Sequence, residues 1–238
     1  MSELRDLEAI SREFGYSRGV MAASIAHCFK VLKPHLKPGR ILELGPAEGL
    51  MTAMLLGVGT PVTVVEGSKA FCDQIKADHP EVDVVHALFE DYAPEGRFDN
   101  IVLGHVLEHV VDPAALLRRV KAWLSPGGIV FAAVPNARSL HRQAAVIMGL
   151  LASEDALNQS DVQHGHRRVF SPESFRNAFY QAGLTVEHFG GYWLKPLSNG
   201  QIEANWTEAM VEAFMQLGER YPDVAGEIYV LASARAET

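Results

Sequence analysis

Between about residue 38 and residue 134, short apolar runs alternate with longer segments whose apolar residues recur at helical spacing. Each run has the length of a buried strand, and each intervening segment has the length of a helix. The runs that predict strands are Ile41–Leu44, Val62–Val65, Val82–His86, Phe98–Leu103 and Ile129–Val134. Helices are predicted through Leu56, from Ser68 to Asp78 and from Pro113 to Leu124, with a turn at Ser125–Gly128. Repeated strand–helix units favour a parallel sheet covered on both faces.

The two ends of the chain depart from this rhythm. Residues 1–37 predict a helical cap, with Leu4, Leu7, Ile10 and Phe14 at helical spacing and a second helix from about Val20 to Leu36. Residues 135–170 contain no clear strand and predict an inserted helical lid. Beyond the lid, the pattern predicts a helix from Ser171 to Ala182, a helix from about Trp206 to Gly218, and strands at Leu184–Tyr192 and Glu227–Ala234. A single domain over residues 1–238 is the simplest interpretation.

Composition narrows the class of protein. The chain of 238 residues is 48% hydrophobic and carries a formal net charge of -8, which argues against a general grip on nucleic-acid phosphates. Cys28 and Cys72 have no metal-ligand spacing, so a reduced, cytoplasmic setting fits best. The N-terminus lacks the apolar core of a secretory signal. The apolar stretch Ala144–Ala152 is less than half of the roughly 20 residues that span a bilayer, so no transmembrane span is expected.

A glycine-containing turn follows the first predicted strand. Gly45 and Gly49 lie in this turn. Glu66 ends the second strand, about two dozen residues after the start of the first strand. Doubly wound folds bind ligands at the carboxyl edge of the sheet, where an acid can accept hydrogen bonds from both ribose hydroxyls. The glycines alone could serve only a tight turn, but together with Glu66 they favour a nucleoside ligand.

These residues resemble the motifs of class I S-adenosylmethionine-dependent methyltransferases, in the small-molecule branch that includes the ubiquinone-biosynthesis O-methyltransferases. The motifs, in family order, are Leu42–Gly45 with Gly49, Glu66, Phe98–Val102, His105–His109 and Leu124–Gly128. The resemblance covers about residues 38–134. It implies a doubly wound, mostly parallel seven-stranded sheet of Rossmann-like type, with a hairpin of the last strands, and it implies S-adenosylmethionine as the cofactor.

The resemblance also assigns the cofactor contacts. Glu43 and Gly45 are expected near the methionine end and Glu66 at the ribose, while Leu88 stands where the family usually has an acid facing adenine. Pro46 and Ala47 replace the family's usual residue followed by glycine. The full expected cofactor-binding set is Tyr16, Glu43, Gly45, Pro46, Ala47, Gly49, Glu66, Gly67, Leu88, Phe89 and His105.

His105 follows the fourth predicted strand, where the resemblance puts it beside the cofactor. As a neutral imidazole near pH 7 it could accept a proton from the methyl acceptor, or it could only close the pocket. His164 and His166 in the lid are further candidates for a catalytic base. The residues expected to contact the acceptor are Glu108, His109, Arg138, Arg142, Arg167, Tyr192 and Lys195. The lid cations could equally be solvated charge, and Glu108 with His109 does not define a metal site, so no metal is expected.

The sequence therefore predicts methyl transfer from S-adenosylmethionine to an oxygen, or less favourably a nitrogen, of a small metabolite. Alternatives are a regulatory subunit that binds the cofactor without turnover, and a nicotinamide-dependent dehydrogenase, although the chain has no Gly-x-Gly-x-x-Gly turn. Nucleic-acid methylation is disfavoured by the charge. The apolar lid stretch leaves open a homodimer contact or a membrane surface.

Overall fold

The computed structural model describes residue 15 and residues 17–234, which form a seven-stranded sheet in the order β3-β2-β1-β4-β5-β7-β6. Strand β7 is antiparallel to both of its neighbours, and the other strands are parallel to one another. The strands are β1 (Ile41–Leu44), β2 (Val62–Glu66), β3 (Asp83–His86), β4 (Phe98–Gly104), β5 (Leu124–Pro135), β6 (Leu184–Tyr192) and β7 (Glu227–Ala234). The predicted fold class is thus confirmed, including the antiparallel hairpin of the last two strands.

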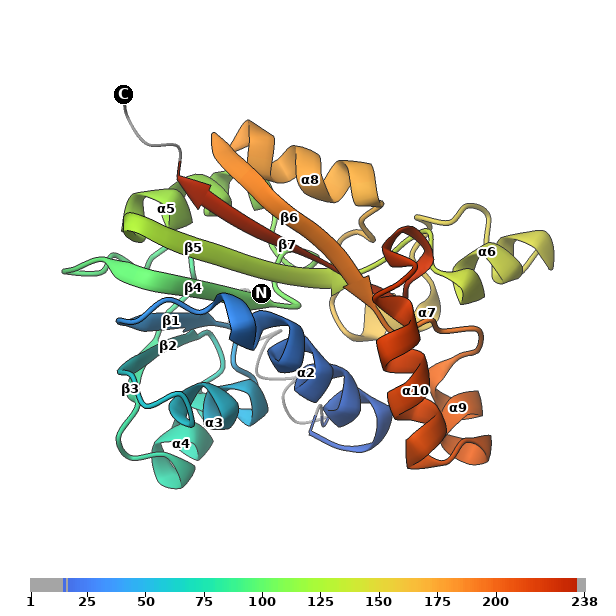
Figure 1. The fold of residues 1–238 in the computed structure, drawn as a ribbon, viewed down its shortest axis with the longest axis horizontal. Helices are drawn as coiled ribbons and strands as arrows, with labels where there is room; N and C mark the ends of the chain where they lie inside the picture. Colours follow the sequence, from blue (N-terminus) through green and yellow to red (C-terminus); the bar gives the residue numbers. More distant parts are fainter. Residues whose placement is uncertain (1–14, 16, 235–238) are drawn as a thin grey trace.

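Helices cover both faces of the sheet (Figure 1). One face packs against α2 (Gly19–Leu32), α3 (Leu50–Leu56), α4 (Lys69–Asp78) and α10 (Glu208–Gly218), and the other against α5 (Pro113–Trp123) and α8 (Pro172–Gln181). Neighbouring strand residues alternate between the two cores, so that Val64 belongs to the first and Val65 to the second. Because both cores are apolar, the central strands read as continuous hydrophobic runs.

Side-chain caps fix the start of the helices that follow strands or loops. Asp112 Oδ1 accepts a hydrogen bond from Ala115 N at 2.9 Å, and Pro113 occupies the first turn of α5. Ser171 Oγ accepts one from Ser174 N at 3.1 Å at the start of α8. Such caps satisfy N–H groups that have no partner inside the helix. They explain why these two predicted helix starts agree with the structure to within a residue.

The segment 135–170 leaves the sheet at β5 and returns at α8. Its two ends lie together, because Ala137 N donates to Phe170 O at 2.8 Å and Asn136 forms a parallel bridge with Phe170. Between them lie α6 (Leu140–Ile147) and α7 (Gln159–Gln163) at the carboxyl end of the sheet (Figure 1). We call residues 135–170 the insertion. The remaining short helices are η1 (Lys33–His35), α9 (Asn199–Asn205) and η2 (Pro222–Val224).

Three expectations need correction or lie outside the described residues. The turn predicted at Ser125–Gly128 is part of β5. Leu124 pairs with Phe98, and a shift in the β4–β5 register between Phe98 and Asn100 accommodates these residues within the strand. The helix predicted at Trp206–Gly218 begins at Glu208, with α9 before it. The first predicted helix falls in residues 1–14, outside the part that the structure describes. None of the described helices has the length and hydrophobicity that a bilayer span requires.

Candidate active site

A cavity of about 780 Å³ opens at the carboxyl ends of β1, β2 and β4. Its walls come from the loops after these strands, from α2, from the insertion and from the start of β7. Ligands of doubly wound folds bind at this edge. The size falls in the range of pockets that hold cofactors and small ligands.

Two buried glutamates line one side of the cavity. Glu66 Oε1 accepts a hydrogen bond from Ser68 N at 2.8 Å, and Oε2 accepts one from Ala47 N at 3.3 Å. Glu43 Oε2 accepts a hydrogen bond from Thr52 Oγ1 at 2.6 Å. Burial raises the pKa of Glu66, and burial with the nearby Glu66 charge raises the pKa of Glu43 to about 7. The carboxylates are therefore held in fixed positions at the ends of two adjacent strands.

The turn after β1 brings the main chain close to the cavity. Gly45 has a φ of 67°, and a Cβ there would lie 3.0 Å from Val106 Cγ2, so both conformation and space favour glycine. Ala47 adopts a φ of 49°, the left-handed region that glycine occupies at little cost. Gly49, at φ 83°, ends the turn. The variant sequence thus forms a glycine-like turn in spite of its alanine.

The loop after β3 supplies the next wall. Leu88 and Phe89 line the cavity, and the Phe89 ring approaches the place where a Gly45 Cβ would be. His86 Nε2 contacts the Gly67 carbonyl at 3.0 Å, which ties this loop to the end of β2. The apolar side chains offer a surface for a flat ring, and among these loop residues Glu90 also lines the cavity. Position 88 carries leucine, where the resembled family usually has an acid.

His105 stands between two carboxylates at the end of β4. Its Nδ1 lies 3.4 Å from Glu108 Oε1, and its Nε2 lies 3.8 Å from Glu227 Oε2. Burial lowers the pKa of His105, but the charges of Glu227 and Glu108 raise it more, to about 9. The imidazole is therefore mostly protonated at neutral pH, which differs from the neutral form that the sequence analysis expects.

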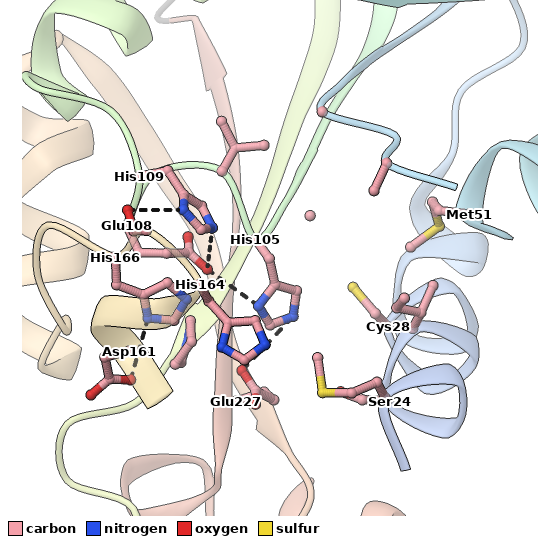
Figure 2. Close-up of a pocket in the computed structure, with 18 of the residues that line it drawn as sticks. Ser24, Cys28, Met51, His105, Glu108, His109, Asp161, His164, His166 and Glu227 are labelled. Atoms are coloured by element: carbon pink, nitrogen blue, oxygen red, sulfur yellow. Dashed lines mark hydrogen bonds and ion pairs between the residues drawn. The ribbon is translucent and has the colours of Figure 1, made fainter. Parts of the chain in front are cut away.

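A second group of side chains surrounds Glu108 (Figure 2). His109 and His166 pack edge to face, with ring centroids 4.8 Å apart. One carboxylate oxygen of Glu108 and one ring nitrogen each of His109 and His166 lie within 4.8 Å of one another. Neither carboxylate oxygen of Glu108 has a hydrogen-bond partner. Burial alone would raise the pKa of Glu108, but His105 and His109 lower it below its ordinary value. These residue types also bind divalent metals, so the three side chains could hold a cation.

The insertion is fastened by a buried ion pair. Arg142 Nη1 lies 3.0 Å from Asp161 Oδ2, and Arg142 also donates to the carbonyls of Glu154 and Ala156. Asp161 Oδ1 lies 3.3 Å from His166 Nδ1, so the same acid orients a histidine of the cavity. Figure 2 shows this side of the cavity facing Ser24, Cys28 and Met51 on the other.

The structure gathers most of the predicted site residues around one cavity. Those that line it are Glu43, Gly45, Pro46, Ala47, Glu66, Gly67, Leu88, Phe89, His105, Glu108, His109, Arg142, His164, His166, Arg167 and Lys195. Gly49 lies in the same turn without contributing to the wall, and Tyr16 lies outside the described residues. Arg142 and Arg167 line the wall but make hydrogen bonds within the protein, Arg167 Nε to His109 O at 2.7 Å.

Two predicted acceptor residues do not reach the cavity. Tyr192 is fully buried at the end of β6 and stacks on His27, with ring centroids 5.5 Å apart. Arg138 points to the surface, where its Nη2 lies 2.8 Å from Glu173 Oε2. These predictions are wrong because the end of β6 that carries Tyr192 is buried in the core, and the exposed Arg138 pairs with the nearest helix.

Sequence reasoning missed Glu227 and Asp161, which both line the cavity. Glu227 is an acid at the start of an otherwise apolar strand, and Asp161 forms a capping box with Asn158 at the start of α7. Each of these signals is local and is also found in surface positions. Only the strand order brings Glu227 beside His105.

The mostly parallel sheet, the glycine-like turn and the acid at the end of β2 fit a class I S-adenosylmethionine-dependent methyltransferase. The methyltransferase domain family matches residues 14–189, so the chain belongs to that family. Solved structures of similar fold contain S-adenosylmethionine or S-adenosylhomocysteine. The chain is therefore an enzyme of the methyltransferase class.

Curated relatives and solved structures agree with this assignment. The chain is 31% identical to a ubiquinone biosynthesis O-methyltransferase of Methylocella silvestris over 71% of this chain and 67% of the relative. It is 26% identical to the protein of the same description from Rhizobium etli, over 86% and 82%. In fold it is similar to an S-adenosylmethionine-dependent methyltransferase of Mesorhizobium loti, with a TM-score of 0.63, 18% identity and coverage of 92% and 99%. The CcbJ methyltransferase of Streptomyces caelestis gives a TM-score of 0.64 at 16% identity, covering 97% and 96%.

Proposed function

We propose that the chain transfers a methyl group from S-adenosylmethionine to an oxygen or nitrogen of a small metabolite. The observation that carries this proposal is one continuous cavity that runs from Glu66 to the polar group around His105. Its volume of about 780 Å³ leaves room for a small acceptor beside the cofactor. The relatives described as ubiquinone biosynthesis O-methyltransferases favour oxygen as the accepting atom.

In this proposal the strand ends hold the cofactor. Glu66 accepts hydrogen bonds from the ribose hydroxyls, the Gly45–Gly49 turn follows the methionine end, and Leu88 and Phe89 flank the adenine ring. The sulfonium supplies an activated methyl group. The protein then has to align the acceptor with that group and exclude water, which are effects of positioning and desolvation.

The acceptor must also lose a proton. As the methyl group moves, its bond to sulfur breaks, its bond to the acceptor forms, and the sulfur keeps the electron pair. We assign the proton to the neutral form of His105, which is a minor form at neutral pH because its pKa is about 9. His166, held by Asp161, and His164 are the alternative bases.

The setting of the protein belongs to the same proposal. A small-molecule acceptor in the cytoplasm, without nucleic acid, is supported by the net charge of -8 and by the size of the cavity. Ile147, Met148 and Leu150 are exposed at the end of α6, which supports a homodimer contact there.

A methyl-transfer screen tests the proposal. Purified protein is incubated with S-adenosylmethionine and single members of a panel of phenols, hydroxy acids, amines and sugars, and S-adenosylhomocysteine is quantified. We expect product that depends on one acceptor class and carries the added methyl group on oxygen or nitrogen. Tight cofactor binding with no acceptor-dependent product would instead indicate the regulatory subunit, and labelled product on RNA or protein alone would also contradict the proposal.

A further inference from the structure

Lys195 and Glu227 lie beside each other on the far wall of the cavity, and the main chain holds both in place. Gly226 N donates to Trp193 O at 2.7 Å, which joins the segment after β6 to the residue before β7. A Cβ on Gly226 would lie 3.1 Å from Lys195 Cβ, so glycine allows the lysine to pack there. His141 N donates to Lys195 O at 3.2 Å and links this wall to α6. The main-chain positions of Lys195 and Glu227 are therefore fixed.

Glu227 presents to the cavity an oxygen that has no hydrogen-bond partner. Its side chain is only 10% exposed, and Oε2 is buried without a hydrogen-bond partner, 3.8 Å from the His105 ring. A buried carboxylate oxygen without a hydrogen bond is costly, because water no longer solvates it. A ligand with an O–H or N–H group at this point would supply the missing bond.

Lys195 presents a cation to the same space. Its Nζ lies 4.7 Å from the centroid of the Trp193 ring, and among residue 15 and residues 17–234 it has no hydrogen bond or ion pair, including none with Glu227. Burial lowers the pKa of Lys195 to about 8, which still leaves the amine mostly charged at neutral pH. An anionic group on a ligand would satisfy this ammonium.

The neighbouring basic side chains do not compete for such an anion. Arg142 is already bonded to Asp161 and to two carbonyls. Burial and the charges of Lys195 and Arg142 lower the pKa of His141 to about 3, so its ring is neutral. Lys195 is therefore the group on this wall that is suited to an anion.

We propose that Lys195 and Glu227 form the acceptor subsite, and that the acceptor is a small carboxylic acid that also bears the hydroxyl or amino group to be methylated. This inference rests on the proposed function, because it names the substrate class of the same cavity. The acid's carboxylate bonds to Lys195, and its hydroxyl or amine donates to Glu227 Oε2. That hydrogen bond brings the accepting atom beside His105. During transfer the proton leaves through this bond to Glu227 Oε2, and it passes on to the neutral ring of His105, whose Nε2 lies 3.8 Å away.

Calorimetric titration of the full chain saturated with S-adenosylhomocysteine tests the subsite without turnover. The probes are 4-hydroxybenzoate and L-phenylalanine, each compared with its carboxamide, and benzoate, which lacks the donor group. We expect at least one of the two acids to bind about 10-fold or more tightly than its carboxamide, the effect of a hydrogen bond to a charged group. Comparing the hydroxy acid with the amino acid shows whether the group that donates to Glu227 is a hydroxyl or an amine.

Variants assign the preference to residues. Lys195→Met should abolish the preference for the acid, Lys195→Arg should keep it, and Lys76→Met, which removes an exposed lysine of α4, should leave it unchanged. Glu227→Gln should weaken the hydroxy or amino acid and leave benzoate unaffected. Retained S-adenosylhomocysteine binding shows that each variant is folded.

Equal affinity for acids and carboxamides, no binding of any acid, or an unchanged preference in Lys195→Met would overturn the subsite. Methyl transfer to an uncharged acceptor would also overturn it, while the proposed function would stand. Acids that bind through Lys195, with no methylated product from any member of the acceptor panel, would support the subsite and refute the proposed function.

Discussion

Nε2 of His105 lies 3.8 Å from Oε2 of Glu227, although β4 and β7 are far apart in the sequence. Strand β5 separates β4 from β7 in the sheet, so the contact forms across its end. The Glu227 charge is the largest influence that raises the pKa of His105, which reaches about 9. The first residue of the last strand thus controls the charge of the histidine after the fourth.

Activity should rise with pH toward about 9 and then level off, because only the neutral form of His105 accepts the acceptor's proton. Glu227→Gln removes an anion beside the ring and lowers its pKa, so the rising limb should move to lower pH by about one unit. The measurement is kcat against pH at saturating cofactor and acceptor, with a chelator present. Glu95→Gln, an exposed acid, is the control for net charge. Superimposable profiles of wild type and Glu227→Gln would rule out this role for His105.

Glu66→Ala should weaken S-adenosylmethionine binding about 10- to 100-fold, because the ribose hydroxyls lose a charged acceptor. Calorimetric titration of the cofactor measures this change. Since Glu66 also accepts hydrogen bonds from Ser68 N and Ala47 N, Glu66→Gln serves as a second variant that keeps the size of the side chain. Glu81→Ala removes an exposed acid and should bind like wild type. Undiminished affinity in Glu66→Ala would refute the ribose contact.

Asp161→Asn should destabilise the fold by about 3 kcal/mol, because it leaves the buried Arg142 charge without its partner. Urea denaturation measures the free energy of unfolding. The matched control is Glu173→Gln, which removes the exposed partner of Arg138 and should cost less than about 1 kcal/mol. Equal losses in the two variants would show that burial does not strengthen the Asp161 pair.

The same acid makes a pH-dependent contribution. Burial raises the pKa of Asp161, but His166, Asn158 and Arg142 lower it more, so the folded-state pKa lies below the ordinary value. The stabilisation is therefore present above the unfolded pKa of about 3.9 and is lost as pH falls through the folded value. The difference in stability between wild type and Asp161→Asn should shrink below about pH 4.

Much of the fold could be predicted because strands rich in apolar residues leave a strong local signal. Ile41–Leu44, Leu184–Tyr192 and Glu227–Ala234 have the same bounds in the structure as in the sequence analysis. The prediction of a turn at Ser125–Gly128 was wrong. Proline and glycine favour a turn locally, but pairing of Leu124 with Phe98 extends the strand through these residues. A long-range contact here overrides the local preference.

The same distinction between local signals and long-range contacts applies to the site. The proposed cofactor edge follows from contiguous motifs, so Glu43, Gly45 and Glu66 could be placed at one edge from sequence. The proposed acceptor wall depends on the order of strands and on the path of the insertion, so Glu227 and Asp161 could not. Tyr192 was misplaced because alternation along a strand does not tell a cavity wall from a second core.

Ala47→Gly should stabilise the protein by roughly 0.5 kcal/mol. Ala47 has a φ of 49°, and a left-handed residue other than glycine costs about 1–2 kcal/mol, whereas glycine loses about 0.4–1 kcal/mol through the entropy of the unfolded chain. Urea denaturation measures the difference. Ala53→Gly is the matched control, because this exposed alanine lies inside α3 and the same substitution should destabilise by about 1 kcal/mol. Cofactor affinity should stay within about twofold, since glycine keeps the N–H that donates to Glu66. Destabilisation of Ala47→Gly to the level of Ala53→Gly would mean that the turn holds no strain at this position.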